Sequence, residues 1–190
     1  MGAAREGPVR AQPPDGDAGV GGELRRFAAF TDTPRGGNPA GVWIGPELPT
    51  AGAMQRIAAE VGFSETVFLT RRGSRSWVAR YHSPEAEVPF CGHATIAAGV
   101  VLGVEHGPGI HVLATRVGDV PVAVDFDGSG RPVATLTSVE PARRAATPRV
   151  VGRALEALGW APSDLDPSIP PAFAYAGSWH LVLAVTAHDI

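Results

Sequence analysis

Residues 94–102 read ATIAAGVVL, and Thr95 is the only polar side chain in this run. A helix that is apolar on every side is buried on every side. The small residues in its middle, Ala97, Ala98 and Gly99, would let neighbouring strands approach the helix closely. We therefore expect a central helix over 94–102 that is threaded through a curled sheet.

The segments on both sides of this helix predict the strands of such a sheet. Short apolar runs bounded by turn-forming residues are typical of strands. Such runs cover 24–30, 40–44, 65–70 and 77–82 upstream, and 110–115, 120–126 and 131–138 downstream. Two further strands are expected over 172–175 and 180–185, after a proline-rich connection.

Two amphipathic helices are expected in addition to the central one. The first lies between Thr50, which can cap its N-terminus, and Gly62, which can end it. The second runs from Pro148 to Leu158, because Thr147 can cap it and proline suits the first helical position.

Similar patterns of strands and one amphipathic helix recur on both sides of residues 107–118, which indicates two units. We expect a disordered leader over 1–22, an N-terminal domain over 23–108 and a partial second domain over 109–190. The second unit contains no counterpart of the all-apolar run, so we expect it to lack a central helix. The predicted fold class is α+β, with a curled mixed sheet around a central helix.

Composition narrows the classes of function. The chain has 190 residues, 44% of them hydrophobic and 18% charged, which is enough apolar content for a core. A formal net charge of -3 without a basic patch argues against nucleic-acid binding. No run has the roughly 18 apolar residues of a membrane helix, and the first residues do not form a secretory signal. We therefore expect a cytoplasmic protein.

A first candidate for chemistry is the segment 62–68, which reads GFSETVF. It places Glu65 where a helix ends and an apolar strand begins. The flanking side chains of Phe63, Val67 and Phe68 could exclude water from the site. Desolvation raises the pKa of a carboxyl group, as a general acid/base requires. A solvated carboxylate at a strand edge is the alternative that these residues leave open.

A second candidate is the segment 90–94, FCGHA, which leads into the central helix. The unpaired backbone N–H groups of a first helical turn favour an anion, and Gly92 would let a ligand approach. His93 can donate a hydrogen bond or shuttle a proton, or it can simply cap the helix. Cys91 can have a lowered thiol pKa beside the helix N-terminus, or it can be a small buried hydrophobe.

Other chemistries find little support in the sequence. Cys91 and His93 are two residues apart, so their side chains are expected to diverge at a helix start and not to form a dyad. One cysteine and the spacing of the histidines argue against a metal site. Glycine-rich nucleotide motifs are absent. We therefore expect neither a metal nor another cofactor.

Three stretches can be interpreted together: GNPAGV at 37–42, FSETVF at 63–68 and RYHSPEAEVPFCGHAT at 80–95. In this order they closely resemble the phenazine-biosynthesis (PhzF-like) isomerase family, a branch of the diaminopimelate-epimerase-like fold. The resemblance implies two pseudo-symmetric domains with the active site in the cleft between them. It also implies cofactor-independent proton transfer next to a carboxylate of a small metabolite.

The resemblance also implies residue roles. Glu65 matches the acid/base glutamate of the family, and Gly92 with His93 matches its ligand-contacting pair. Cys91 falls where related epimerases carry one of two catalytic thiols, and a chain with one cysteine cannot supply the second. The predicted catalytic residues are thus Glu65 and His93.

Four further residues of the two motifs are predicted to bind the substrate. They are Ser64, Cys91, Gly92 and Ala94.

The second half of the family pattern is incomplete in this sequence. The family's second domain normally adds an acidic residue and a Gly-Ser-rich helix start, and neither is found before Ile190. Gly177 and Ser178 lead into a strand-like run, and Asp189 lies in the wrong context. We expect either an isomerase or epimerase, a catalytically incomplete fragment or binding module, or two chains that complete each other as a homodimer.

Overall fold

The structure is a computed structural model that describes residues 21–31 and 36–186. Most of the expected leader, residues 1–20, therefore lies outside the described residues. The chain divides into two compact units, Met1–Val139 and Glu140–Ile190. Each unit is described here by itself.

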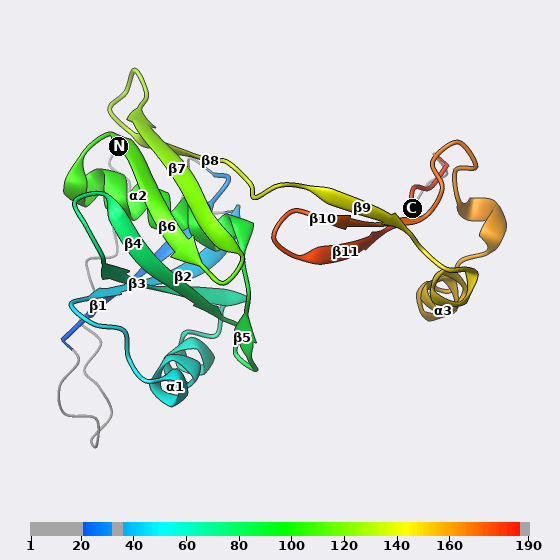
Figure 1. The fold of residues 1–190 in the computed structure, drawn as a ribbon, viewed down its shortest axis with the longest axis horizontal. Helices are drawn as coiled ribbons and strands as arrows, with labels where there is room; N and C mark the ends of the chain where they lie inside the picture. Colours follow the sequence, from blue (N-terminus) through cyan, green and yellow to red (C-terminus); the bar gives the residue numbers. More distant parts are fainter. Residues whose placement is uncertain (1–20, 32–35, 187–190) are drawn as a thin grey trace. The chain divides into compact units, whose positions relative to one another are not determined.

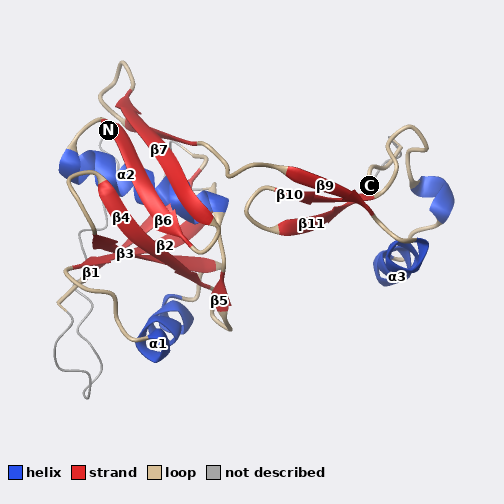
Figure 2. Cartoon of the chain, viewed as in Figure 1, coloured by secondary structure: helices blue, strands red, loops and turns tan. Residues whose placement is uncertain are grey.

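The first unit is built on one strongly curled mixed sheet (Figures 1 and 2). Its strand order is β1-β2-β3-β4-β6-β7-β8, and the short β5 pairs with β4. The pairs β2–β3 and β4–β6 are parallel, and the other neighbours are antiparallel. The strands are β1 (Glu23–Ala29), β2 (Asn38–Gly45), β3 (Glu65–Arg71), β4 (Ser76–His82), β5 (Glu87–Val88), β6 (Gly109–Thr115), β7 (Gly118–Phe126) and β8 (Pro132–Leu136).

The central helix α2 (Gly92–His106) contacts strands from β1 to β8 and confirms the expectation of a helix enclosed by a curled sheet. Ala94, Ala98 and Leu102 are each 0% exposed. Gly99 allows a close approach of β7, because a Cβ at this position would lie 2.6 Å from Cγ1 of Val122. The helix extends beyond the all-apolar run of 94–102 to His106, and most residues of this last turn are at least partly exposed.

A second helix, α1 (Ala51–Val61), packs on the other face of the sheet. As expected, the hydroxyl of Thr50 accepts a hydrogen bond from the Ala53 N–H at 3.2 Å, and Gly62 ends the helix in the left-handed region at φ 71°. Alternation along β3 directs Val67 toward α2 and Phe68 toward α1. The first unit therefore has two apolar layers, one on each face of β3.

The second unit is a three-stranded antiparallel sheet of order β11-β10-β9 with the helix α3 (Pro148–Leu158). The bounds of α3 match the prediction, although the side chain of Thr147 makes no capping hydrogen bond. Arg144 stacks over the rings of Phe173 and Trp179. The other elements are β9 (Ala142–Ala145), a 3₁₀ turn (Pro162–Asp164), β10 (Ala172–Tyr175) and β11 (Trp179–Val182).

The compact units divide after Val139, whereas the sequence predicts a division between 108 and 109. The difference arises because β6 pairs in parallel with β4, with Ser76 opposite Val112, and β7 and β8 extend the same sheet. Among the described residues, none of the helices has the length and hydropathy that crossing a bilayer requires.

Candidate functional site

Two segments that carry the predicted residues meet at one end of α2. Ser64 and Glu65 stand where the chain enters β3, just after the left-handed Gly62 that ends α1. Cys91 and His93 stand at the N-terminus of α2. The sheet fixes the first segment, because Glu65 pairs with Ala40 of β2 in the parallel register.

The imidazole of His93 lies at the centre of this cluster. Its Nε2 is 3.4 Å from Oε2 of Glu65 and 3.4 Å from Oγ of Ser64. Its Nδ1 is 3.2 Å from Sγ of Cys91. The side chains of His93 and Glu65 are 10% and 21% exposed, so water can reach them. The structure thus brings together Ser64, Glu65, Cys91 and His93.

The prediction that Cys91 and His93 diverge was wrong. Cys91 is the N-cap of α2 and has an extended backbone, with φ -144° and ψ 119°. Helical spacing therefore does not apply to it, and its side chain points back toward the imidazole of His93. The structure places thiol and imidazole within contact distance.

The apolar surroundings of Glu65 also differ from the sequence prediction. Phe63 and Phe68 belong to the apolar layer around α1, on the other face of β3. Val67 is the one of the three flanking residues that packs in the layer around α2.

The thiol of Cys91 is a poor anion in this position. Burial raises the pKa of Cys91 to about 12, and the negative charge of Glu65 adds to the effect. The N–H groups of Ala94 and His93 favour the thiolate, but they do not outweigh burial. The sequence left open a lowered pKa for this thiol, and the structure gives the opposite direction.

This raised pKa predicts slow alkylation of the folded chain. Only the thiolate reacts, so iodoacetamide near neutral pH should modify Cys91 roughly 1,000-fold more slowly than a free cysteine. Mass spectrometry measures the rate, and the same chain in concentrated urea is the control, which should react at the ordinary rate. Equal rates for folded and unfolded chains would contradict this account of the thiol.

Two buried hydroxyl groups support the start of α2 from inside the core. The hydroxyl of Thr95 donates to the carbonyl oxygen of Cys91 at 2.7 Å, and Tyr81 Oη lies 2.8 Å from Thr95 Oγ1. Because the Thr95 hydrogen is used, Tyr81 is the donor in the second bond. Neither residue was among the predicted site residues, although Thr95 is conspicuous as the one polar side chain in an apolar run.

Replacing Thr95 by Val should destabilise the chain by about 1–3 kcal/mol, because it leaves the buried hydroxyl of Tyr81 without its acceptor. Thr95→Ser is the control, since it keeps the hydroxyl and loses only a methyl group. Urea unfolding measures the free energy of unfolding of both variants. In the double variant Thr95→Val with Tyr81→Phe, part of the loss should return; a purely additive loss would contradict the coupling.

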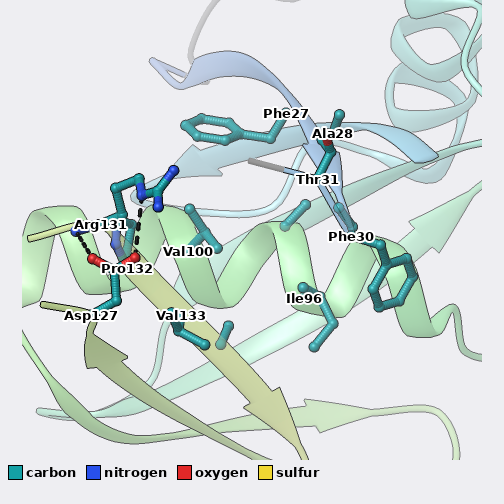
Figure 3. Close-up of a pocket in the computed structure, with 13 residues that line it drawn as sticks. Phe27, Ala28, Phe30, Thr31, Ile96, Val100, Asp127, Arg131, Pro132 and Val133 are labelled. Carbon is teal, nitrogen blue, oxygen red and sulfur yellow. Dashed lines mark hydrogen bonds and ion pairs between the residues drawn. The ribbon is translucent and has the colours of Figure 1, made fainter. Parts of the chain in front are cut away.

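A separate cavity of about 320 Å³ lies between β1, α2 and β8 (Figure 3). Its lining is mostly apolar, with Phe27, Ile96 and Val100 among its residues. The carboxylate in this lining, Asp127, is bound by Ser129 and Arg131, and these hydrogen bonds hold its pKa well below the usual range. A carboxylate held by hydrogen bonds in this way is a weaker base than an ordinary carboxylate.

Comparisons with known proteins show a likeness over most of the chain. Residues 27–189 match the profile of a family described as phenazine biosynthesis-like protein. The uncharacterized isomerase YfhB of Bacillus subtilis is 32% identical over 164 residues, which cover 85% of this chain and 55% of the relative. An uncharacterized isomerase of Deinococcus radiodurans is 38% identical over 82% of this chain and 52% of its own length. The chain spans about half the length of these curated relatives.

Solved structures show the same likeness. A predicted epimerase from Pseudomonas aeruginosa superposes with a TM-score of 0.78 at 25% identity, over 86% of this chain and 59% of that one. A hydroxyproline epimerase from Agrobacterium vitis superposes with a TM-score of 0.54 at 12% identity, over 92% of this chain and 53% of that one, which shows the fold alone. The predicted epimerase-like α+β fold is confirmed.

Proposed function

Because the chain belongs to the phenazine biosynthesis-like protein family, we propose that it carries a proton-transfer half-site of a cofactor-independent isomerase or epimerase. The proposed substrate is a small metabolite with a carboxylate. Glu65 is the proposed acid/base, and the start of α2 is the proposed binding site for the substrate carboxylate.

The observation that carries this proposal is the position of His93 between Glu65 and Ser64, at 3.4 Å from an oxygen of each. A base needs a partner that orients it and a polar group that holds the substrate beside it. The ring of His93 can orient the carboxylate of Glu65. The hydroxyl of Ser64 lies on the same side and can bind the substrate.

In the proposed step, a carboxylate oxygen of Glu65 takes the proton from the carbon next to the substrate carboxylate. The electron pair of the broken C–H bond moves into the adjacent carboxyl group, and Glu65 becomes a neutral carboxylic acid. Glu65 then returns the proton to a carbon of the substrate, and its negative charge is restored. The charges balance without an added oxidant or reductant.

The first turn of α2 suits the negative charge of this substrate. Its amide N–H groups and the helix dipole stabilise an anion by about 0.3–1 kcal/mol. The N–H groups of His93 and Ala94 favour a negative charge on the sulfur of Cys91, and this sulfur is a weak acceptor that a carboxylate can replace. A Cβ at Gly92 would meet no heavy atom of the described residues within 4 Å, so a ligand has room there.

A screen in deuterated water tests the proposal. Small carboxylic acids with an acidic carbon–hydrogen bond are incubated with the chain, and mass spectrometry detects incorporated deuterium. We expect at least one compound to gain deuterium at the carbon next to its carboxylate. If no compound of a broad set exchanges faster than in buffer alone, the proposal fails for this chain.

A further inference from the structure

We infer that Glu65, Cys91 and His93 form an inhibitory binding site for a zinc-type divalent cation. One ligand atom from each residue lies within 4.8 Å of the others. Within residues 21–31 and 36–186, this is the one group of three or more His, Cys, Asp or Glu side chains gathered so closely. Spacing along the sequence could not reveal it, because the glutamate comes from β3 and the other two residues from the start of α2.

The donor set is the one that zinc prefers: a sulfur, an imidazole nitrogen and a carboxylate oxygen. Tetrahedral coordination at the usual bond lengths puts such atoms roughly 3.4–3.6 Å apart. The distances from His93 to Cys91 Sγ and to Glu65 Oε2 are 3.2 and 3.4 Å, but they involve different ring nitrogens. The ligand separations therefore exceed the tetrahedral values by at most about 1.4 Å, since the largest separation allowed by the cluster is 4.8 Å.

Three protein ligands on one side leave a fourth position open to water. The side chains of Glu65 and His93 are partly exposed, whereas Cys91 closes the site from the core. Binding releases the thiol proton of Cys91 to solvent, so two anionic ligands neutralise the two positive charges of the ion. The occupied site then has no net charge, so the helix dipole at the start of α2, which disfavours a lone cation, is not a barrier to binding.

Inhibition follows because a bound ion occupies the carboxylate lone pair that would accept the substrate proton. This consequence rests on the proposed function, whereas the binding of the ion rests only on the three ligands. A chelator should restore the proton exchange of a zinc-treated chain.

Cobalt is a suitable probe, because a thiolate bound to Co²⁺ absorbs in the near ultraviolet and the chain has one cysteine. Titration of the chelator-treated 190-residue chain with Co²⁺ should give this band at one ion per chain. Zn²⁺ should then displace the cobalt and remove the band. Cys91→Ser should abolish the band, and Glu65→Gln and His93→Asn should weaken cobalt binding by at least about tenfold.

His180→Asn is the matched control, because it removes an exposed histidine of the second unit and should leave the affinity unchanged. Far-ultraviolet circular dichroism establishes that each variant is folded. The inference is overturned if the folded wild-type chain gives no thiolate band, or if Glu65→Gln and His93→Asn both bind cobalt as the wild type does. Cobalt binding without any proton exchange in the metal-free chain would instead refute the proposed function and leave the metal site standing.

Discussion

A chain with Glu65→Gln should fold normally and bind carboxylate ligands, but exchange their acidic proton about 100- to 10,000-fold more slowly than the wild type. The amide has nearly the shape of the carboxylate, so it can keep the contact with His93, whose Nε2 lies 3.4 Å from Oε2 in the wild type. It cannot accept a proton from carbon. Deuterium uptake followed by proton NMR measures the difference.

Glu60→Gln is the control for this experiment, because it makes the same change of charge on an exposed residue of α1. Its exchange rate should equal that of the wild type. Equal rates in the wild type and Glu65→Gln would remove Glu65 from the mechanism. Equal losses in both variants would indicate an effect of net charge.

The second large effect is expected in the core of the first unit. Leu102 is 0% exposed and lies in α2, where the curled sheet surrounds it. Replacement by Ala should lower the free energy of unfolding by about 2–5 kcal/mol, because it removes buried methyl groups and leaves a cavity. Urea unfolding followed by circular dichroism measures this loss.

Val104 provides a control on the same helix, because its side chain is 52% exposed. Val104→Ala should change the free energy of unfolding by no more than about 0.5 kcal/mol. If the two variants lost similar amounts, the helix would not be enclosed as described.

Much of the fold could be predicted from local patterns. The all-apolar run predicted the central helix. Thr50 and Gly62 predicted the ends of α1, because a threonine hydroxyl can cap a helix and glycine adopts the left-handed conformation that ends one. The strands β5 and β9 were missed because they are short and largely exposed. Pairing with another strand, β4 for β5 and β10 for β9, makes these segments extended.

Residues of the site that belong to a motif could be predicted from the sequence. Contacts that depend on how the elements pack could not. The motifs predicted that Glu65 and His93 belong to one site, and the structure places their side chains 3.4 Å apart. The support of Cys91 by Thr95 and Tyr81 depends on contacts between β4 and α2, which sequence spacing does not contain. The contact between Cys91 and His93 was not predicted, because helical spacing does not hold for Cys91, whose backbone is extended.

Several expectations stay predictions. They are the cytoplasmic location, the possible homodimer and the absence of a central helix in the second domain. Sedimentation of the purified chain tests the homodimer directly.

The most direct test of the central claim uses the unaltered 190-residue chain after chelator treatment and dialysis, which remove metals and small cofactors. Its incubation in deuterated water with a carboxylate that exchanges in the screen is followed by proton NMR. We predict loss of the signal of the proton next to the carboxylate, at a rate that added cofactors do not change. Exchange that requires an added cofactor, or that continues undiminished in Glu65→Gln, would contradict the account.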